Sequence, residues 1–157
     1  HETAFKFKEM VLDRFGFEVD VHEFPEGTKT AEGAADAIGC DVSQIGKNIV
    51  MKVGDDLVVI VTSGSNRVSE EKLGSFLGVS SDDIRTANPE EIKDRTGWSI
   101  GGVPPFCHDD EVKVILDKTL MSFETVWTAA GTPNTVFPIS SEKLREFADA
   151  EVGEVAE

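Results

Sequence analysis

The sequence predicts a single α/β domain in which helices surround a mixed β-sheet. Apolar residues recur at helical spacing in some segments and alternate with polar residues in others. Two β-branched runs flank Gly54-Asp55-Asp56, which is typical of a hairpin turn. Strands are expected singly and in hairpins between helices of uneven length, which favours a mixed sheet over a regular doubly wound fold. The 157 residues fit one domain.

The first part of the chain predicts a helix, a strand and a second helix. Apolar residues at near-helical spacing predict a helix over 3–14, which Gly16 terminates. Strict alternation over 17–24 predicts a half-buried strand. The alanine-rich segment 30–38 predicts a short helix closed by Gly39.

The middle of the chain predicts a hairpin followed by two helices. The β-branched runs 48–53 and 57–62 form the hairpin, and Lys47 stands at its start. Leu73, Phe76 and Leu77 lie on one face of a predicted helix over 69–77. Asn88-Pro89-Glu90-Glu91 supplies an N-cap, a proline and an acid for a helix through residue 94.

The remainder predicts a hydrophobic loop, three strands and a last helix. The loop 97–105 is rich in glycine and proline but too apolar for a bare linker, so we expect it to line a site. Strands are expected over 112–116, 125–128 and 135–139. Ser140 or Ser141 caps a helix through Phe147, and the chain from Asp149 is expected to be frayed. We divide the domain into 1–27 (helix and strand), 28–147 (core) and 148–157 (acidic tail).

Composition narrows the functional classes. Thirty acidic against fifteen basic residues give a formal net charge of -15, which repels nucleic acid in ordinary salt. Near 1 M salt the Debye length falls to about 3 Å, so we expect a salt-accumulating host. No apolar stretch approaches the roughly 20 residues that cross a bilayer, and we expect a cytoplasmic protein without a membrane partner. Cys40 and Cys107 are far apart, which indicates neither zinc nor a redox dithiol.

Motifs for nucleophilic catalysis and for cofactors are missing. Ser63-Gly64-Ser65 has Val61 where the hydrolase elbow requires glycine. No phosphate-binding loop or dinucleotide fingerprint is present, so no cofactor is expected. His22 fits an exposed strand position, whereas His108 closes the loop and fits a structural or a chemical role equally well.

Lys47 and the loop 97–105 remain as the candidate site. The backbone amides of Gly101 and Gly102 can approach a carbonyl or oxyanion closely, while Pro104 and Pro105 stiffen the loop. A lysine ammonium can steady a phosphate or the charge that develops on an ester carbonyl. The pair suits acyl-ester hydrolysis, although a strand-end lysine is usually a solvated charge and such a loop is usually a turn.

Five segments together resemble the YbaK/ProX family of free-standing aminoacyl-tRNA deacylases, which are related to the editing domain of bacterial prolyl-tRNA synthetases. The resemblance covers about 28–147. It is carried by Thr30-Ala31-Glu32-Gly33-Ala34-Ala35, Ile45-Gly46-Lys47-Asn48-Ile49-Val50, Asn66-Arg67-Val68, Thr96-Gly97-Trp98-Ser99-Ile100-Gly101-Gly102-Val103-Pro104-Pro105-Phe106 and Val126-Trp127-Thr128-Ala129-Ala130-Gly131-Thr132-Pro133-Asn134.

The resemblance implies a mixed, barrel-like sheet and hydrolysis of the ester of a mischarged tRNA, most simply Cys-tRNA(Pro) or Ala-tRNA(Pro). It assigns catalysis to Lys47, Gly101 and Gly102, with the substrate's own 2′-hydroxyl helping to position water. The expected substrate-binding residues are Thr30, Asn48, Val103, Pro104, His108 and Gly131. Asn48 replaces a common Thr or Ser, and Cys107 a common Gly, which puts specificity in doubt. Trp98, Phe106 and Trp127 fit either pocket or core, and core is favoured for Trp127.

The resemblance also names partners and leaves alternatives. The acceptor end of aminoacyl-tRNA is the expected partner, with prolyl-tRNA synthetase as a second one and no DNA. Phosphate contacts are confined to a few cations. These are Lys29, Lys47, Lys52, Arg67 and Lys118. The rival interpretations are a non-catalytic module that binds an aminoacyl-adenosine, nucleotide or tRNA end, and a small-molecule esterase with the same pocket.

Overall fold

The computed structural model describes residues 2–24 and 30–157. Pro25, where the predicted first strand ends, and Lys29 lie outside the described residues. The helices within the described ranges are α1 (Glu2–Phe15), α2 (Ala31–Ile38), α3 (Glu70–Leu77), α4 (Pro89–Thr96) and α5 (Ser141–Ala148). The strands are β1 (His22–Glu23), β2 (Ile45–Val53), β3 (Asp56–Ser63), β4 (Ile84–Thr86), β5 (Lys113–Asp117), β6 (Thr125–Ala129), β7 (Thr135–Ser140) and β8 (Glu151–Gly153). Short 3₁₀ helices precede β2 and β4 and follow β5.

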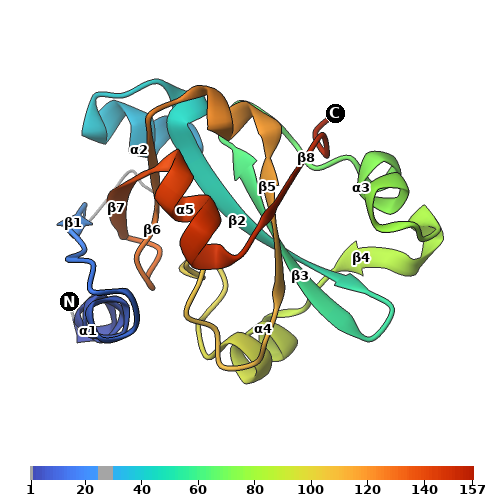
Figure 1. The fold of residues 1–157 in the computed structure, drawn as a ribbon, viewed down its shortest axis with the longest axis horizontal. Coiled ribbons are helices and arrows are strands. Elements are labelled where there is room, and N and C mark those ends of the chain that lie inside the picture. The colour runs from blue at the N-terminus through green and yellow to red at the C-terminus, as the bar shows by residue number, and fades with distance from the viewer. Residues whose placement is uncertain (1, 25–29) are drawn as a thin grey trace.

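The strands form one mixed sheet, as the sequence predicts. Its order is β1-β7-β6-β2-β3-β5-β8, with β4 paired to β2 beside this path. The β2–β3 hairpin is antiparallel, whereas β6 joins β2 and β5 joins β3 in parallel. Within the described residues the sheet does not close into a barrel, because β1 and β8 remain as its two edges. Figure 1 shows α5 in front of the sheet, α1 below β1, α3 at the opposite end near β4, and α4 below the middle of the sheet.

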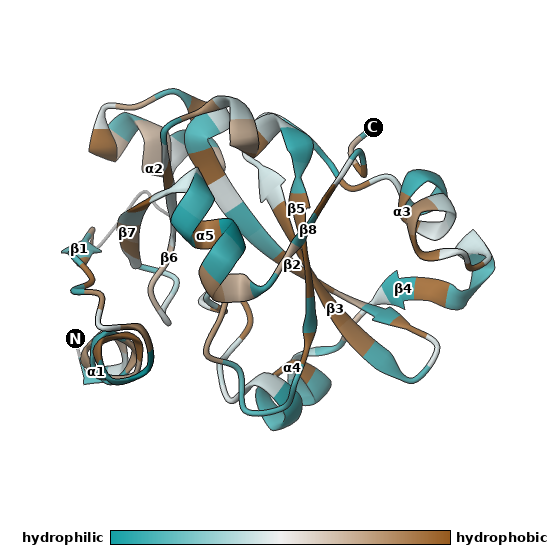
Figure 2. Cartoon of the chain, viewed as in Figure 1, coloured by the Kyte–Doolittle hydropathy of each residue, from teal (hydrophilic) through white to brown (hydrophobic). Residues whose placement is uncertain are grey.

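Alternation along β3 separates two hydrophobic cores. Leu57, Val59 and Val61 point into the larger core, and Val58 and Ile60 into a smaller core that α3 covers. Successive strand residues face opposite sides of a sheet, so a strand buried on both sides reads as a continuous apolar run. The central strands β3 and β5 are accordingly hydrophobic along most of their length, whereas α4 is mostly hydrophilic (Figure 2).

Local capping explains where several helices begin. The Asn88 side chain accepts from Glu91 N–H and the Glu91 side chain accepts from Asn88 N–H, the predicted capping box of α4. Ser140 caps α5. Thr30 caps α2, with Gly33 N–H donating to its hydroxyl at 3.0 Å. These caps are typical of helix starts and confirm the predicted boundaries to within a residue or two.

Two predicted segments are wrong. Residues 17–21 alternate in burial, with Val19 fully buried, but only His22–Glu23 pair with another strand. The alternation of apolar and polar residues indicates that one side of this segment is buried. It does not indicate that another strand is hydrogen-bonded to the segment. The predicted frayed tail instead forms β8 alongside β5, and Val155 is fully buried. Its acidic side chains point outward while its backbone completes the sheet edge.

An aromatic cluster joins α1 to the rest of the domain. Phe7 is fully buried, and its ring lies 5.8 Å from Trp98, 5.7 Å from Phe106 and 5.2 Å from Phe137. Such ring pairs add to the stabilisation that burial alone provides. The cluster therefore holds the ends of the loop 97–105 against α1 and β7, which supports the core interpretation of Trp98 and Phe106.

Replacing Phe7 with alanine tests this anchor. We expect Phe7→Ala to lower the free energy of unfolding by about 3–5 kcal/mol, since a large buried side chain leaves a cavity. Phe5→Ala is the matched control, because Phe5 lies on the same helix with 61% of its surface exposed, and we expect a change within about 0.5 kcal/mol. Urea unfolding of both variants measures the difference; equal losses would contradict the assignment of Phe7 to the core.

Candidate active site

The site begins at a split along one edge of β2. The parallel strand β6 pairs only with Ile45 and Gly46 at the start of β2. The antiparallel strand β4 pairs only with Met51 to Val53 at its end. Between these two partners, residues 47–49 of β2 pair with no strand of the described residues on this edge, and the loop 97–107 approaches them at Asn48. Lys47 and Asn48 lie at this opening.

Lys47 is half-buried, and its ammonium donates to the backbone carbonyl of Asn66 at 2.8 Å. This contact uses one of the donors of the ammonium and leaves others for a ligand. Burial lowers the pKa of Lys47 below its ordinary value. The Glu32 carboxylate opposes this effect, Arg67 adds to it, and Asp117 opposes it. The sequence predicted Lys47 at the start of the strand. In the structure β2 begins two residues earlier, at Ile45, so Lys47 lies within the strand.

Asn48 ties three segments together. Its amide nitrogen donates to Val103 O and to Thr128 Oγ1, both at 2.8 Å, and Thr128 Oγ1 donates to Gly46 O at 2.9 Å. A carbonyl can only accept, so the atom that faces Val103 must be the nitrogen. Both amide hydrogens are then used. Asn48 Oδ1 is buried and has no hydrogen-bond partner among the described residues.

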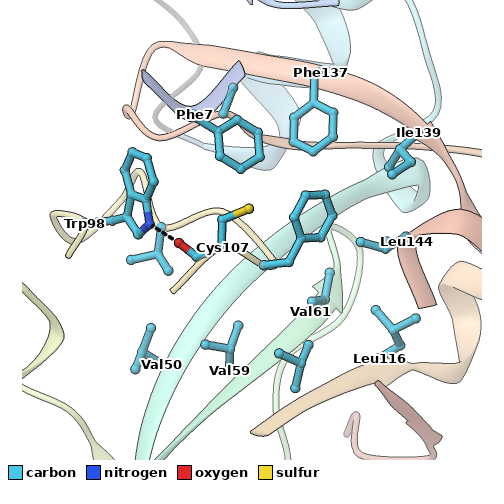
Figure 3. Close-up of a cluster of buried hydrophobic side chains, with 14 of the residues drawn as sticks. Phe7, Val50, Val59, Val61, Trp98, Cys107, Leu116, Phe137, Ile139 and Leu144 are labelled. Atoms are coloured by element: carbon cyan, nitrogen blue, oxygen red, sulfur yellow. Dashed lines mark hydrogen bonds between the residues drawn. The ribbon is translucent and has the colours of Figure 1, made fainter. Parts of the chain in front are cut away.

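The loop is fixed at both of its ends. Trp98 Nε1 donates to Cys107 O at 2.9 Å, which closes the loop on itself. Figure 3 shows this bond beside Phe7 and Phe137, with Trp98 and Cys107 facing the hydrophobic core. Cys107 has a positive φ of 66°, an uncommon conformation for a residue other than glycine. With its ends fixed in this way, the loop places Val103 next to Asn48 of β2.

Gly101 and Gly102 have different surroundings. Gly102 lies against the backbone of the β6–β7 turn, where a Cβ atom would come within 2.6 Å of Thr132 Cα. Its N–H donates to Ser99 O at 3.0 Å and is thus already paired within the loop. Gly101 has a φ of 87°, and its N–H has no partner in the part of the chain that the structure describes. Gly102 sets the position of the loop, and Gly101 offers a donor.

These elements enclose a cavity of about 210 Å³. Its lining combines polar side chains with small apolar ones. The lining residues are Thr30, Ala31, Ala34, Ile45, Gly46, Lys47, Asn48, Ile49, Gly101, Val103, Thr128, Ala129, Thr132, Pro133, Thr135 and Val136. The lining thus comes from α2, β2, the loop and the β6–β7 hairpin, segments that are far apart in the sequence.

Five of the nine site residues predicted from the sequence meet at this cavity. They are Thr30, Lys47, Asn48, Gly101 and Val103. The four others, which are Gly102, Pro104, His108 and Gly131, stand outside its described lining. His108 Nε2 donates to Pro104 O at 2.8 Å, and burial lowers the pKa of His108. This hydrogen bond stabilises the conformation of the loop at a position outside the cavity lining.

Three threonines of the lining, Thr128, Thr132 and Thr135, were not predicted as site residues. Thr128 lies within the quoted segment 126–134, but nothing in its local pattern marks its hydroxyl as a partner of Asn48. Thr132 and Thr135 bond to each other at 2.7 Å across the β6–β7 turn. Asn66 was quoted for the resemblance without a role, and its contact with Lys47 depends on how β3 ends. Only the three-dimensional structure identifies these contacts.

A larger hollow of about 680 Å³ lies near the far end of the β2–β3 hairpin, around Val53, Lys113 and Glu151. Both cations of its lining, Lys113 and Arg95, are already paired. Lys113 Nζ lies 2.5 Å from Glu151 Oε1, and Arg95 Nε lies 3.4 Å from Asp110 Oδ2. The smaller cavity is therefore the better candidate, because it holds polar groups that still need partners.

The described residues contain neither a cluster of metal ligands nor a helix able to cross a membrane. No group of three or more His, Cys, Asp or Glu side chains in the described ranges is arranged to hold a metal ion. Within the same ranges, none of the helices combines the length and the apolar character that a bilayer span requires.

Comparison with known families identifies this architecture. The model of the family described as "Aminoacyl-tRNA editing domain" matches residues 25–147. The chain belongs to this family. The match includes every lining residue of the cavity and ends at the last turn of α5.

Relatives of this editing domain include free-standing and fused proteins. "Uncharacterized protein YwhH" of Bacillus subtilis is 36% identical over 138 residues, covering 86% of this chain and 85% of that protein. The "Proline--tRNA ligase" of Lactobacillus acidophilus is 33% identical over 85% of this chain, which spans only 25% of the ligase. A crystal structure described as "a putative trans-editing enzyme for prolyl tRNA synthetase" has a TM-score of 0.92 at 32% identity, covering 100% of this chain and 98% of that one.

The close packing of Gly102 gives a prediction for the editing domain. Gly102→Ala places a methyl group against the Thr132 backbone, so we expect the loop to shift and the free energy of unfolding to fall by about 1–3 kcal/mol. Ser99→Ala is the control in the same loop, because the Ser99 side chain is exposed and its carbonyl is retained. Thermal melts of both variants measure the effect. An unchanged melting temperature in Gly102→Ala would contradict the backbone contact.

Proposed function

We propose that this editing domain is a trans-editing deacylase. It hydrolyses the ester that joins a wrong amino acid to the 3′ end of tRNA, with Cys-tRNA(Pro) or Ala-tRNA(Pro) as substrate. The observation that carries the proposal is that three groups able to bind a ligand meet at one cavity. They are the Lys47 ammonium, the Gly101 N–H and the buried, unpartnered Asn48 Oδ1.

The size of the cavity supports an aminoacyl group as the ligand. Pockets that hold drug-sized molecules have volumes of roughly 300–1,000 Å³, and this cavity has about 210 Å³. It suits one small amino acid, with the adenosine and the rest of the tRNA outside. Discrimination by one methylene is worth only about 1–3 kcal/mol, so the tRNA must contribute to substrate identity.

The same groups suggest how the ester is cleaved. Water attacks the ester carbonyl, and negative charge develops on its oxygen. The tetrahedral adduct then collapses, the bond from the acyl carbon to the 3′ oxygen breaks, and the 3′ oxygen leaves as a hydroxyl with the proton that the water gives up. The Lys47 ammonium and the Gly101 N–H stabilise that charge, as preorganised donors do in other acyl-transfer sites. Asn48 Oδ1 accepts a hydrogen bond from the amino group of the aminoacyl moiety. His108 is not used as a base, since it lies outside the described lining of the cavity and its Nε2–H donates a hydrogen bond to Pro104 O. The 2′-hydroxyl of the terminal ribose positions the water.

Contacts to the tRNA are few on this acidic surface. Arg67 is exposed and close enough to Lys47 to affect its charge, and we assign it to the nearest phosphate. Lys52, in contrast, lies 2.6 Å from Glu91 and is engaged in an ion pair. Binding is therefore confined to the acceptor end, with prolyl-tRNA synthetase as an assisting partner in the cytoplasm.

Deacylation assays with Ala-tRNA(Pro) and Cys-tRNA(Pro) in molar potassium chloride test this function. We expect wild-type protein to hydrolyse one of them and Lys47→Ala to lose about 100-fold or more in kcat/KM, the typical cost of removing an oxyanion donor. Lys52→Ala is the matched control, because Lys52 lies on the same strand outside the cavity.

The outcomes separate the competing functions. Equal activity of Lys47→Ala and wild type would reject the site. No hydrolysis of any aminoacyl-tRNA by folded wild type would favour a binding module instead. Hydrolysis of an aminoacyl ester that lacks the tRNA, at the same rate as the charged tRNA, would favour a small-molecule esterase.

A further inference from the structure

Asp117, at the end of β5, is a buried carboxylate close to the site but outside the cavity lining. Asp117 is only 2% exposed to solvent. Ser63 N–H donates to its Oδ2 at 3.0 Å, and Thr119 N–H donates to its Oδ1 at 3.1 Å. The described residues provide no ion pair for it. A buried charge is costly unless hydrogen bonds satisfy it, so these donors must hold it in one orientation.

Asn66 connects this carboxylate to Lys47. Its side-chain nitrogen donates to Asp117 Oδ2 at 2.9 Å and to Thr119 Oγ1 at 3.0 Å. The backbone carbonyl of the same residue accepts from Lys47 Nζ at 2.8 Å. The side chain of Asn66 is thus fixed by Asp117, and its carbonyl fixes the ammonium. Within the described ranges, this is the one hydrogen bond that the Lys47 ammonium makes.

We propose that Asp117 is a positioning residue for Lys47. Through Asn66 it holds the carbonyl that orients the ammonium, and its negative charge favours the ammonium form. The kinetic part of this inference rests on the proposed function, whereas the coupling between the two residues does not. Asp117 touches neither the cavity nor the substrate and acts only through Asn66 and through its field.

The charges around Lys47 determine the direction of the effect. Burial lowers the pKa of Lys47, the Glu32 carboxylate on α2 raises it, the Arg67 guanidinium lowers it, and Asp117 raises it. Removing the charge of Asp117 therefore lowers the pKa of Lys47 further. The ammonium is present below this pKa, so the variant loses it at a lower pH than wild type does. In the variant, the alkaline limb of the pH profile of deacylation therefore also moves to lower pH.

Two variants separate charge from geometry. Asp117→Asn removes the charge of the carboxylate while keeping its shape. Asn66→Ala removes the side-chain link but keeps both the backbone carbonyl and the charge of Asp117. Asp82→Asn is the control for the loss of one negative charge, because Asp82 is exposed and lies in the short 3₁₀ helix Ser81–Asp83 before β4. Circular dichroism establishes which variants are folded, and Asn66→Ala keeps the proposal testable if Asp117→Asn does not fold.

The first measurement is an NMR titration of the Lys47 Cε resonance in the full chain, assigned with Lys47→Ala. We expect a downward shift of the pKa of Lys47 in Asp117→Asn, a smaller change in Asn66→Ala and none in Asp82→Asn. The second measurement is deacylation: kcat should fall about tenfold in Asp117→Asn and in Asn66→Ala with KM little changed, a typical coupling within one hydrogen-bond network.

The NMR result decides the proposal even when no reaction is observed. A shift in Asp117→Asn without deacylation by wild type would support the coupling and reject the proposed function. An unshifted pKa of Lys47 in Asp117→Asn, or an unchanged kcat in both variants of an active enzyme, would overturn the positioning role.

Discussion

The hydrogen bonds of the Asn48 amide nitrogen hold the site together. They join β2 to the loop at Val103 and to β6 at Thr128, across the split where β2 has no strand partner. Without this bridge, a free strand edge would face the loop. Both amide hydrogens are used for architecture, and Oδ1 is buried without a hydrogen-bond partner among the described residues. One side chain therefore serves the fold and, under the proposed function, also binds the aminoacyl group.

The loop reaches Asn48 because aromatic packing fixes its ends. Trp98 and Phe106 contact Phe7 of α1, so a helix outside the matched residues 25–147 helps to position the glycines of the site. Gly102 brings the loop against the β6–β7 turn, and Gly101 lies at the cavity. On the other side of β2, Asn66 holds the Lys47 ammonium. The donors are thus placed from two independent directions, which is the preorganisation that electrostatic stabilisation requires.

The sequence predicted correctly the caps and turns that neighbouring residues determine. It failed for two segments whose structure depends on pairing with a distant strand. The Asn88 capping box, the Gly54 hairpin and the Ser140 cap depend on neighbouring residues, and the structure contains all of them. The segment 17–21 and strand β8 depend on whether another strand lies alongside, which alternation and charge do not encode. Lys47 and Gly101 could be predicted from residue type and family resemblance. The bonds of Thr128 and Asp117 could not, because their partners lie about 50 to 80 residues away in the chain.

The proposed function requires that the cavity between β2, the loop and the β6–β7 turn holds an aminoacyl group attached to adenosine. Its most direct test is an NMR titration of the nitrogen-labelled protein with alanyl-adenosine in which a non-hydrolysable amide replaces the 3′ ester. We expect saturable shifts of the Asn48 side-chain amide and the Gly101 backbone amide, with little change around Val53 and Glu151. An absence of shifts at Asn48 and Gly101, or shifts confined to the larger hollow near Glu151, would contradict it.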